Sequence, residues 1–199
     1  MKKIVCAASL VLFAFCMVHA QQTSFGIRAG FNASSVGIED GADYNSKTGI
    51  HLGGLAHIHI TDHFAFQPEL IFSAQGGKDD DNDEIRLKLN YVNIPLLVQY
   101  MTRDGFRLQT GPQLGFLASA KSKVGDVEVD IKDDLESTEL AWVFGAGYLF
   151  PRGNGLGIDI RYNHGISNIS EDNDFEARNR TFQIGIFYQF SKARSGKRR

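Results

Sequence analysis

Three histidines in one short segment carry side chains that readily bind metals. His51, His57 and His59 are separated by even numbers of residues, so they share one face if the segment is a β-strand. The His57-x-His59 spacing can ligate zinc, and Glu69 could add a carboxylate. Spacing alone is not a complete ligand set, and the polar interior of a barrel also needs hydrogen-bonding side chains. We therefore expect no metal site at these histidines.

Residues 79–84, Asp-Asp-Asp-Asn-Asp-Glu, resemble a calcium-binding loop in composition. They do not fit the EF-hand pattern, because Glu84 stands where glycine is required and Asn90 stands where a bidentate glutamate belongs. We interpret the segment as a solvated acidic loop, which divalent ions could bridge to anionic lipid.

Signs of catalysis are weak. His164 and Ser167 could be assigned to a lipid-modifying enzyme, but neither has an evident third partner. The sequence contains no Gly-x-Ser-x-Gly, no Walker loop and no nucleotide-binding fingerprint. We predict no catalytic residue, no cofactor and no nucleic-acid partner.

The N-terminus has the pattern of an export signal. Lys2 and Lys3 precede an apolar stretch over residues 4–18, and Val18-His19-Ala20 supplies the small residues that a signal peptidase accepts. The stretch is short for a membrane span. We predict a signal peptide over residues 1–20, cleaved after Ala20.

Both cysteines of the chain lie inside this signal. Cys16 could mark a lipoprotein, but Phe15 stands directly before it, where lipoprotein processing needs a small residue. With Cys6 and Cys16 removed, the mature chain has no cysteine. It can form neither a disulfide nor a thiol nucleophile.

Periodicity in the mature chain predicts the fold. Eight segments alternate apolar residues with polar residues or glycine, a period of two that is typical of β-strands. They cover residues 25–32, 50–60, 64–75, 85–101, 106–116, 140–150, 156–163 and 182–190. The phase changes within 85–101, where we expect a β-bulge near Tyr91-Val92. No apolar run of the mature chain is long enough for a transmembrane helix, but a barrel strand shows only alternate residues to lipid.

Connection lengths point to a membrane barrel. Short connections at residues 61–63, 102–105 and 151–155 alternate with long ones at about 33–47, 77–84, 119–138 and 167–179. Outer-membrane barrels have short periplasmic turns and long extracellular loops. The acidic residues are assigned to the long connections, except Asp62, Glu69, Asp104 and Asp159. We predict an all-β fold: an eight-stranded antiparallel up-and-down transmembrane β-barrel over residues 21–190.

Charged residues also occur on the predicted inner face, which carries Arg28, Glu69, Arg107, Asp159 and Arg161. An eight-stranded barrel is just wide enough for side chains to fill it. A lone buried charge costs several kcal/mol. We expect these five residues to be paired and to plug the lumen.

The connection over residues 119–138 is the longest of the four. It contains Val127-Glu128-Val129-Asp130-Ile131, an alternating run that could extend a strand beyond the membrane as a hairpin. An exposed strand edge can recruit a partner strand. A merely solvated acidic loop is the alternative.

Six short motifs resemble the small outer-membrane β-barrels of the PorT-like group. They are residues 25–32 (FGIRAGFN), 66–70 (FQPEL), 91–97 (YVNIPLL), 110–113 (TGPQ), 144–148 (FGAGY) and 161–166 (RYNHGI). The resemblance covers about residues 24–190 and implies the fold and an outer-membrane location. It carries no functional residue onto this chain. One departure is the basic tail over residues 191–199, since such barrels usually end on the aromatic residue of the last strand, here Phe190.

Together these features predict an integral, multi-pass outer-membrane protein with an envelope-structural or surface-loop binding role and no catalysis. Its expected partners are outer-membrane lipids and the barrel insertion machinery, and a protein could bind at the extracellular loops. A soluble exported lipocalin-like barrel for a small apolar ligand and a lipid-modifying barrel enzyme are the alternatives.

Overall fold

The computed structural model describes residues 23–38, 44–78, 85–124, 127–169 and 177–190. The predicted signal peptide over residues 1–20, the acidic segment 79–84 and the basic tail 191–199 lie outside the described residues.

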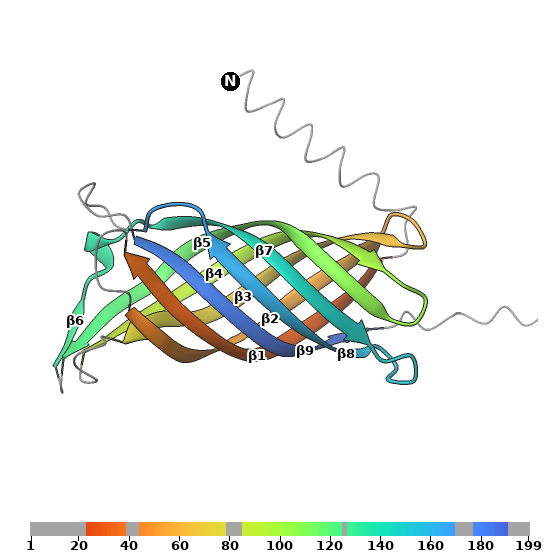
Figure 1. Cartoon of the computed structure of the whole chain (residues 1–199), viewed down its shortest axis with the longest axis horizontal. Coiled ribbons are helices and arrows are strands. Elements are labelled where there is room, and N and C mark those ends of the chain that lie inside the picture. Colours follow the sequence, from red (N-terminus) through yellow and green to blue (C-terminus); the bar gives the residue numbers. More distant parts are fainter. Residues whose placement is uncertain (1–22, 39–43, 79–84, 125–126, 170–176, 191–199) are drawn as a thin grey trace, which may run out of the picture.

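The described chain is almost entirely β-strand and closes on itself (Figure 1). The strands are β1 (Thr23–Ile38), β2 (Tyr44–His59), β3 (Phe64–Lys78), β4 (Ile85–Met101), β5 (Phe106–Val124), β6 (Val127–Asp130), β7 (Thr138–Leu149), β8 (Leu156–Gly165) and β9 (Ala177–Gln189), with a short 3-10 helix at Lys132–Asp134. All pairings are antiparallel, and β1 pairs with β9. The barrel has eight strands, as predicted, and β6 is a short extra strand on the tip of β5.

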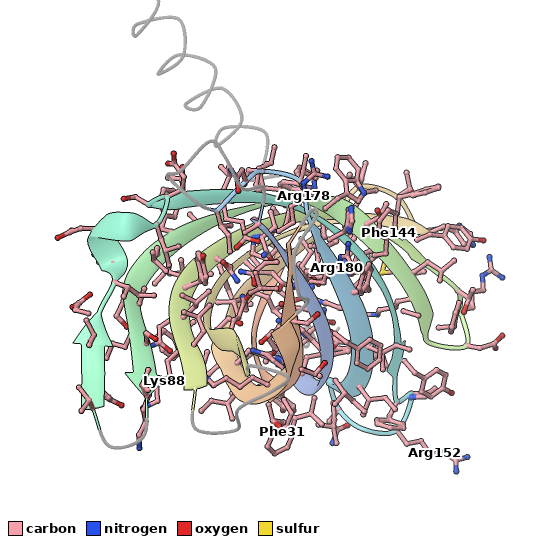
Figure 2. The ribbon with its side chains drawn as sticks, turned by 60° about the vertical axis from the view of Figure 1, so that its left-hand side comes forward. Phe31, Lys88, Phe144, Arg152, Arg178 and Arg180 are labelled. Atoms are coloured by element: carbon pink, nitrogen blue, oxygen red, sulfur yellow. The ribbon has the colours of Figure 1, made fainter. Side chains whose placement is uncertain are left out.

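The alternation has the predicted orientation. Ile160 and Ile186 are about half exposed on the outer wall, whereas Asp159 and Arg161, the residues before and after Ile160, are buried inside. Phe31 and Phe144 project from the outside of the ribbon (Figure 2). The outer wall is therefore apolar and aromatic, and the inner wall is polar.

The β-bulge lies on a different strand from the one predicted. β4 alternates without interruption, because its pairing with β3 is continuous from Lys88 to Asn93. The register shifts instead between β4 and β5, where Asn90 pairs with Ser119 and Tyr91 pairs with Leu117. The prediction failed because Leu89 and Tyr91 are apolar and yet point inward, so their apolar character did not mark the outer face.

Several strands are longer than the alternation predicted. β1 continues to Ile38 and β5 to Val124, so much of the expected connections 33–47 and 119–138 is strand. Backbone hydrogen bonding does not require an apolar side chain, so strands can extend past the point where the outward residues stop being apolar. The three short connections lie together at one end of the barrel, and the long connections lie at the other end (Figure 1). Two of them contain glycines with positive φ, Gly105 at 96° and Gly155 at 108°, a conformation that glycine adopts without strain.

The described part of the chain contains no helix that is long and apolar enough to span a membrane.

Candidate functional site

A charged cluster lies inside the barrel, between β1, β3 and β8. Arg161 on β8 contacts Glu69 on β3 through two parallel bonds, Nη1–Oε2 at 2.7 Å and Nη2–Oε1 at 2.8 Å. Asp159 accepts from Arg28 Nη2 at 2.9 Å and lies 3.2 Å from Arg161 Nη2. We call Arg28, Glu69, Asp159 and Arg161 the charged cluster. Its four members come from three strands and are buried, so they tie opposite walls of the barrel together.

Neutral amides add hydrogen bonds to the charged cluster. Gln67 Nε2 donates to Glu69 Oε1 at 2.6 Å, and Gln109 Oε1 accepts from Arg161 at 3.2 Å. Space for these long side chains comes from glycine: a Cβ at Gly145 would lie 2.9 Å from Arg161 Cγ. Charge-assisted bonds of this kind are stronger than neutral ones. Each carboxylate of the cluster is therefore compensated by two guanidinium groups.

Arg107 does not join the charged cluster, although the sequence predicted that it would be paired. Its Nη2 donates to Gln189 Oε1 at 3.1 Å, and its guanidinium lies 5.3 Å from the centre of the Phe187 ring. No carboxylate of the described residues lies within ion-pair distance of it. A cavity of about 10 Å3 adjoins Arg107, with Gln99 and Asp159 in its wall. A hydrogen bond to the Gln189 side chain and a contact with the Phe187 ring replace the expected carboxylate partner.

The three histidines point inward as predicted but are separately bonded. His51 Nδ1 lies 2.7 Å from Asn32 Oδ1, and His57 Nδ1 lies 3.0 Å from Gln67 Oε1. His59 packs edge-on against His57 with ring centres 4.6 Å apart. Within the described ranges, no group of three or more His, Cys, Asp or Glu residues could hold a metal ion.

At the long-loop end the interior changes from polar to apolar. The buried residues there form an apolar cluster of Val36, Leu89, Tyr91, Leu117, Ala120 and Ile169. Ile169 lies outside the strands, in the connection that follows β8, and its N–H donates to Ala177 O at 2.9 Å. The interior at this end of the barrel therefore includes a buried apolar cluster.

Glu139 is a buried site residue that the sequence analysis missed. It was counted with the acidic residues of the long connections, but it is the second residue of β7 and only 4% exposed. Asn179 Nδ2 donates to its Oε2 at 3.3 Å. The buried polar side chains around it were also not singled out, because polar residues beside a loop look like part of that loop.

The tip of β5, residues 121–124, pairs with β6, residues 127–130, as a two-stranded hairpin at the long-loop end (Figure 2). One face of the hairpin continues the inner wall and carries exposed valines: Val124, Val127 and Val129 are 50%, 64% and 52% exposed. The other face is charged. Glu128 is held there by Lys88 and by Lys121, the latter at 3.5 Å. These contacts lower the pKa of Glu128, the hydrogen bond from Lys88 most of all.

Among the described strands, β6 pairs only with β5, so its other edge is open. The N–H of Ile131 donates to Ala120 O at 3.1 Å. Because antiparallel bonding alternates along a strand, Glu128 and Asp130 direct their own N–H and C=O groups toward the open edge. The predicted hairpin is therefore present, and it combines exposed apolar side chains with a free strand edge.

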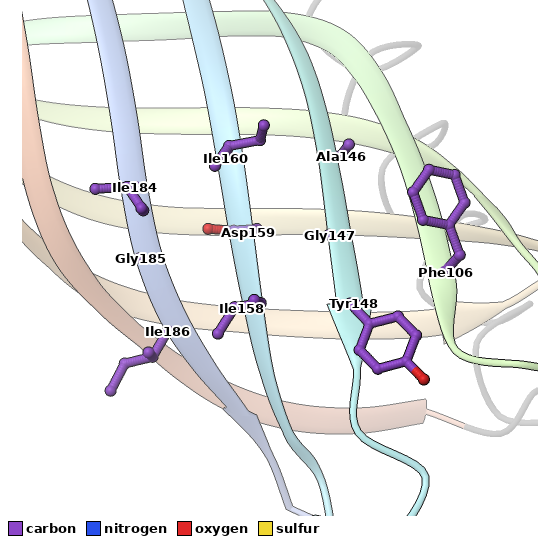
Figure 3. Close-up of a pocket in the computed structure, with 10 residues that line it drawn as sticks. All are labelled: Phe106, Ala146, Gly147, Tyr148, Ile158, Asp159, Ile160, Ile184, Gly185 and Ile186. Atoms are coloured by element: carbon purple, nitrogen blue, oxygen red, sulfur yellow. The ribbon is translucent and has the colours of Figure 1, made fainter.

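The outer wall has a shallow apolar groove of about 390 Å3 across β7, β8 and β9 (Figure 3). Ile158, Ile160, Ile184 and Ile186 line it, with Phe106 and Tyr148 at one side. Figure 3 shows Ile158 and Ile160 on the outside of β8. Asp159 between them belongs to the charged cluster inside.

A family model described as "outer membrane protein beta-barrel domain" matches residues 19–171. The chain belongs to this family. Residues 19–171 include β1 to β8. This assignment fixes the location: the protein is a multi-pass β-barrel of the outer membrane, and the apolar outer wall faces lipid. The long-loop end is then extracellular and the short-turn end periplasmic.

Solved structures show the same architecture. The attachment invasion locus protein Ail of Yersinia pestis is 15% identical, with a TM-score of 0.53, covering 85% of this chain and 99% of that chain. Ail in complex with the heparin analogue sucrose octasulfate is 18% identical with a TM-score of 0.51 and the same coverage. Neisserial surface protein A is 14% identical with a TM-score of 0.54, again covering 85% and 99%. At these identities the likeness concerns the fold. No curated protein sequence matches the chain.

The outer-membrane location excludes the soluble lipocalin-like alternative. A soluble barrel would not surround a charged interior with an apolar outer wall. The enzyme alternative rested on His164 and Ser167. His164 stacks on Tyr162, with ring centres 6.2 Å apart, and Ser167 Oγ accepts from the Leu140 N–H at 2.9 Å. The two side chains thus have different partners.

Proposed function

We propose that this outer-membrane barrel is a closed, non-catalytic scaffold that binds an extended segment of a partner protein at the open edge of β6. The observation that carries the proposal is the combination of exposed valines and an unpaired strand edge on one extracellular hairpin. Exposed strand edges and apolar patches mark interaction surfaces. Binding there would follow the β-augmentation mode, in which a peptide adds a strand to a sheet.

The chemistry of the hairpin defines the partner strand. A strand paired with β6 would place alternate side chains beside Val127 and Val129 and the others beside Glu128 and Asp130. Apolar pairs and opposite-charge pairs across strands are stabilising. The proposed partner segment therefore alternates apolar and basic residues.

A closed lumen is the second part of the proposal. The charged cluster and its glutamines support it, because their bonds cross the barrel from β8 to β3 and from β1 to β8. The apolar cluster adds a second layer at the extracellular mouth. Ions and sugars would have no water-filled path, so the protein would not act as a porin.

The remaining proposals rest on the sequence. We propose that the chain matures by loss of residues 1–20 and that the barrel insertion machinery recognises residues 21–190, which residues 191–199 follow as a basic tail. The finer assignment to the PorT-like group rests on the Tyr91-Val92-Asn93-Ile94-Pro95-Leu96 motif. The absence of a catalytic role is proposed because His164 and Ser167 have separate partners.

A peptide-binding assay tests the hairpin proposal. The full chain, refolded in detergent, is titrated with a labelled peptide of alternating lysine and valine, and with a glutamate-valine peptide as the charge-reversed control. We expect the lysine-valine peptide to bind more tightly. Replacing residues 125–134 with a short Gly-Ser turn should abolish binding while the barrel still resists SDS until boiled.

A single position separates edge pairing from charge. Asp130→Pro removes an N–H at the open edge, whereas Asp130→Ala removes only the carboxylate. Edge pairing predicts that the proline variant binds more weakly than the alanine variant. If the two variants bind equally, or if the Gly-Ser replacement still binds, the open edge is not the site. If that replacement prevents folding, the segment belongs to the scaffold.

A further inference from the structure

Glu139 differs from the other buried carboxylates of the interior because it has no basic partner. Glu69 and Asp159 each contact two arginines. In the part of the chain that the structure describes, no Lys, Arg or His side chain lies within ion-pair distance of Glu139, which is held by the Asn179 amide at 3.3 Å. An ionised carboxylate buried without a counter-charge is strongly unfavourable.

One side of Glu139 is bordered by two residues of β4, Asn93 and Tyr91. Gly115 on β5 pairs with Asn93 on β4 and with Glu139 on β7. Because Gly115 has no side chain, its neighbours close over it: a Cβ there would lie 2.9 Å from Asn93 Oδ1 and 3.4 Å from Glu139 Cβ. The ring of Tyr91 approaches the same point to 3.4 Å. Gly115 thus lets the Asn93 amide and the Tyr91 ring pack beside the side chain of Glu139.

The other side of Glu139 is bordered by β8 and β9. A Cβ at Gly165 would lie 3.2 Å from Glu139 Oε1, so the carboxylate reaches toward β8. Asn163 is the preceding inward residue of β8, and Asn179 pairs across to the adjoining strand β1 at Val36. Glu139 therefore lies between polar side chains from three neighbouring parts of the wall.

Several of these polar atoms are buried and unpartnered among the described residues. They are Tyr91 OH, Asn93 Oδ1 and Nδ2, Asn163 Oδ1 and Asn179 Oδ1. Asn93 and Asn179 are only 1% and 2% exposed. Buried polar groups are nearly always bonded to protein, to water or to an ion. Four of these five atoms are oxygens, which can coordinate a cation.

We propose that Glu139, with the side-chain oxygens of Asn93, Asn163 and Asn179 and the Tyr91 hydroxyl, forms a buried binding site for one hard metal cation. Carboxylate and amide oxygens are the ligands that Ca2+ prefers, about six to eight of them in irregular geometry. The cation would supply the positive charge that the arginines supply to Glu69 and Asp159. The apolar cluster, to which Tyr91 also belongs, covers the site on its extracellular side, so we expect slow exchange.

Terbium luminescence tests the site, because Tb3+ replaces Ca2+ at oxygen ligands and is excited through nearby tyrosine. The full chain in detergent is compared with Glu139→Gln, which keeps the shape but loses the charge. Acidic residues of the long loops are the same in both proteins, so their signal cancels. We expect wild type to bind one more Tb3+ per chain, displaced by Ca2+. Glu128→Gln, an exposed carboxylate, is the matched control and should keep that ion.

Asn93→Asp provides a test with the opposite sign. A second carboxylate at this position should tighten binding of Tb3+ and Ca2+, since affinity rises with ligand charge. If Glu139→Gln does not fold, this variant and wild type still decide the matter through the calcium dependence of the temperature at which the SDS-resistant form unfolds. Equal ion binding by wild type and Glu139→Gln, or no effect of Asn93→Asp on affinity, would overturn the proposal.

Discussion

Two sets of ion pairs in this barrel use similar chemistry in opposite surroundings. In the charged cluster, Arg161 donates two short hydrogen bonds to Glu69, and all four side chains are almost fully buried. At the hairpin, Lys88 of the neighbouring strand β4 and Lys121 of β5 both contact Glu128, and the three side chains are 36–48% exposed. The buried set has displaced water and must be complete, whereas the exposed set competes with water and salt.

This difference distinguishes the barrel interior, where substitutions are costly, from the hairpin, where substitutions are tolerated. Removing one member of the charged cluster leaves an uncompensated charge in the interior. Removing one member of the hairpin set leaves a side chain that water can solvate. The interior is therefore constrained by its own pairing, and variation that alters binding is tolerated at the hairpin.

The largest expected effect comes from breaking the buried set. Arg161→Met should lower the free energy of unfolding by about 3–5 kcal/mol, because Glu69 and Asp159 each lose one of their two cations. Urea unfolding in lipid vesicles, followed by the fluorescence of the single tryptophan, measures it. Arg161→Met combined with Glu69→Gln should recover part of the loss. A cost below about 1 kcal/mol, as for an exposed pair, would remove the contrast between the two sets.

A smaller effect on stability is expected from arginine substitutions, which compare the lipid-facing wall with the exposed hairpin. Ile160→Arg should destabilise the barrel by about 2–4 kcal/mol, because the arginine would face the apolar part of the bilayer. Val129→Arg on the hairpin is the matched control and should change stability little, since Val129 is exposed outside the membrane. Equal costs at the two positions would mean that the outer wall at Ile160 does not face lipid.

The sequence predicts this architecture only where the type of a residue depends on its contact with lipid. Ile160 beside Arg161 reports which face meets lipid, so the orientation of the strands was predicted correctly. Ile38 and Val124 end strands well beyond the apolar belt, where alternation no longer follows from lipid contact. The strand ends were therefore misplaced. Alternation of apolar and polar residues therefore marks the part of each strand that contacts lipid. The backbone hydrogen bonds between strands continue beyond that part.

The interior partners were harder to predict because they depend on barrel stagger. Arg107 and Arg161 both point inward by alternation, but only Arg161 reaches the carboxylates from β3 and β8. Which side chains meet across the lumen follows from the register of distant strands, which local sequence does not encode. Glu139 was missed for a related reason: Ser137 and Thr138 before it are polar, so the start of β7 resembled the loop.

The smallest effect concerns protonation of the hairpin. The hydrogen bond and charge of Lys88 lower the pKa of Glu128. The contribution of this contact is therefore present above the ordinary glutamate pKa and is lost as pH falls through the lowered value. An NMR titration of the Glu128 side chain should show the lowered pKa in wild type and a return toward the ordinary value in Lys88→Met. An unchanged titration in Lys88→Met would mean that the exposed contact has no electrostatic effect.

Ion conductance tests the central claim, a closed scaffold with its binding surface outside, most directly. Wild-type protein reconstituted in planar lipid bilayers should give no stable large conductance, because we propose that the charged cluster and the apolar cluster close a lumen that eight strands leave barely wide enough for side chains. Reproducible, porin-like conductance steps from the wild-type protein would contradict the account, since an open lumen would place transport inside the barrel.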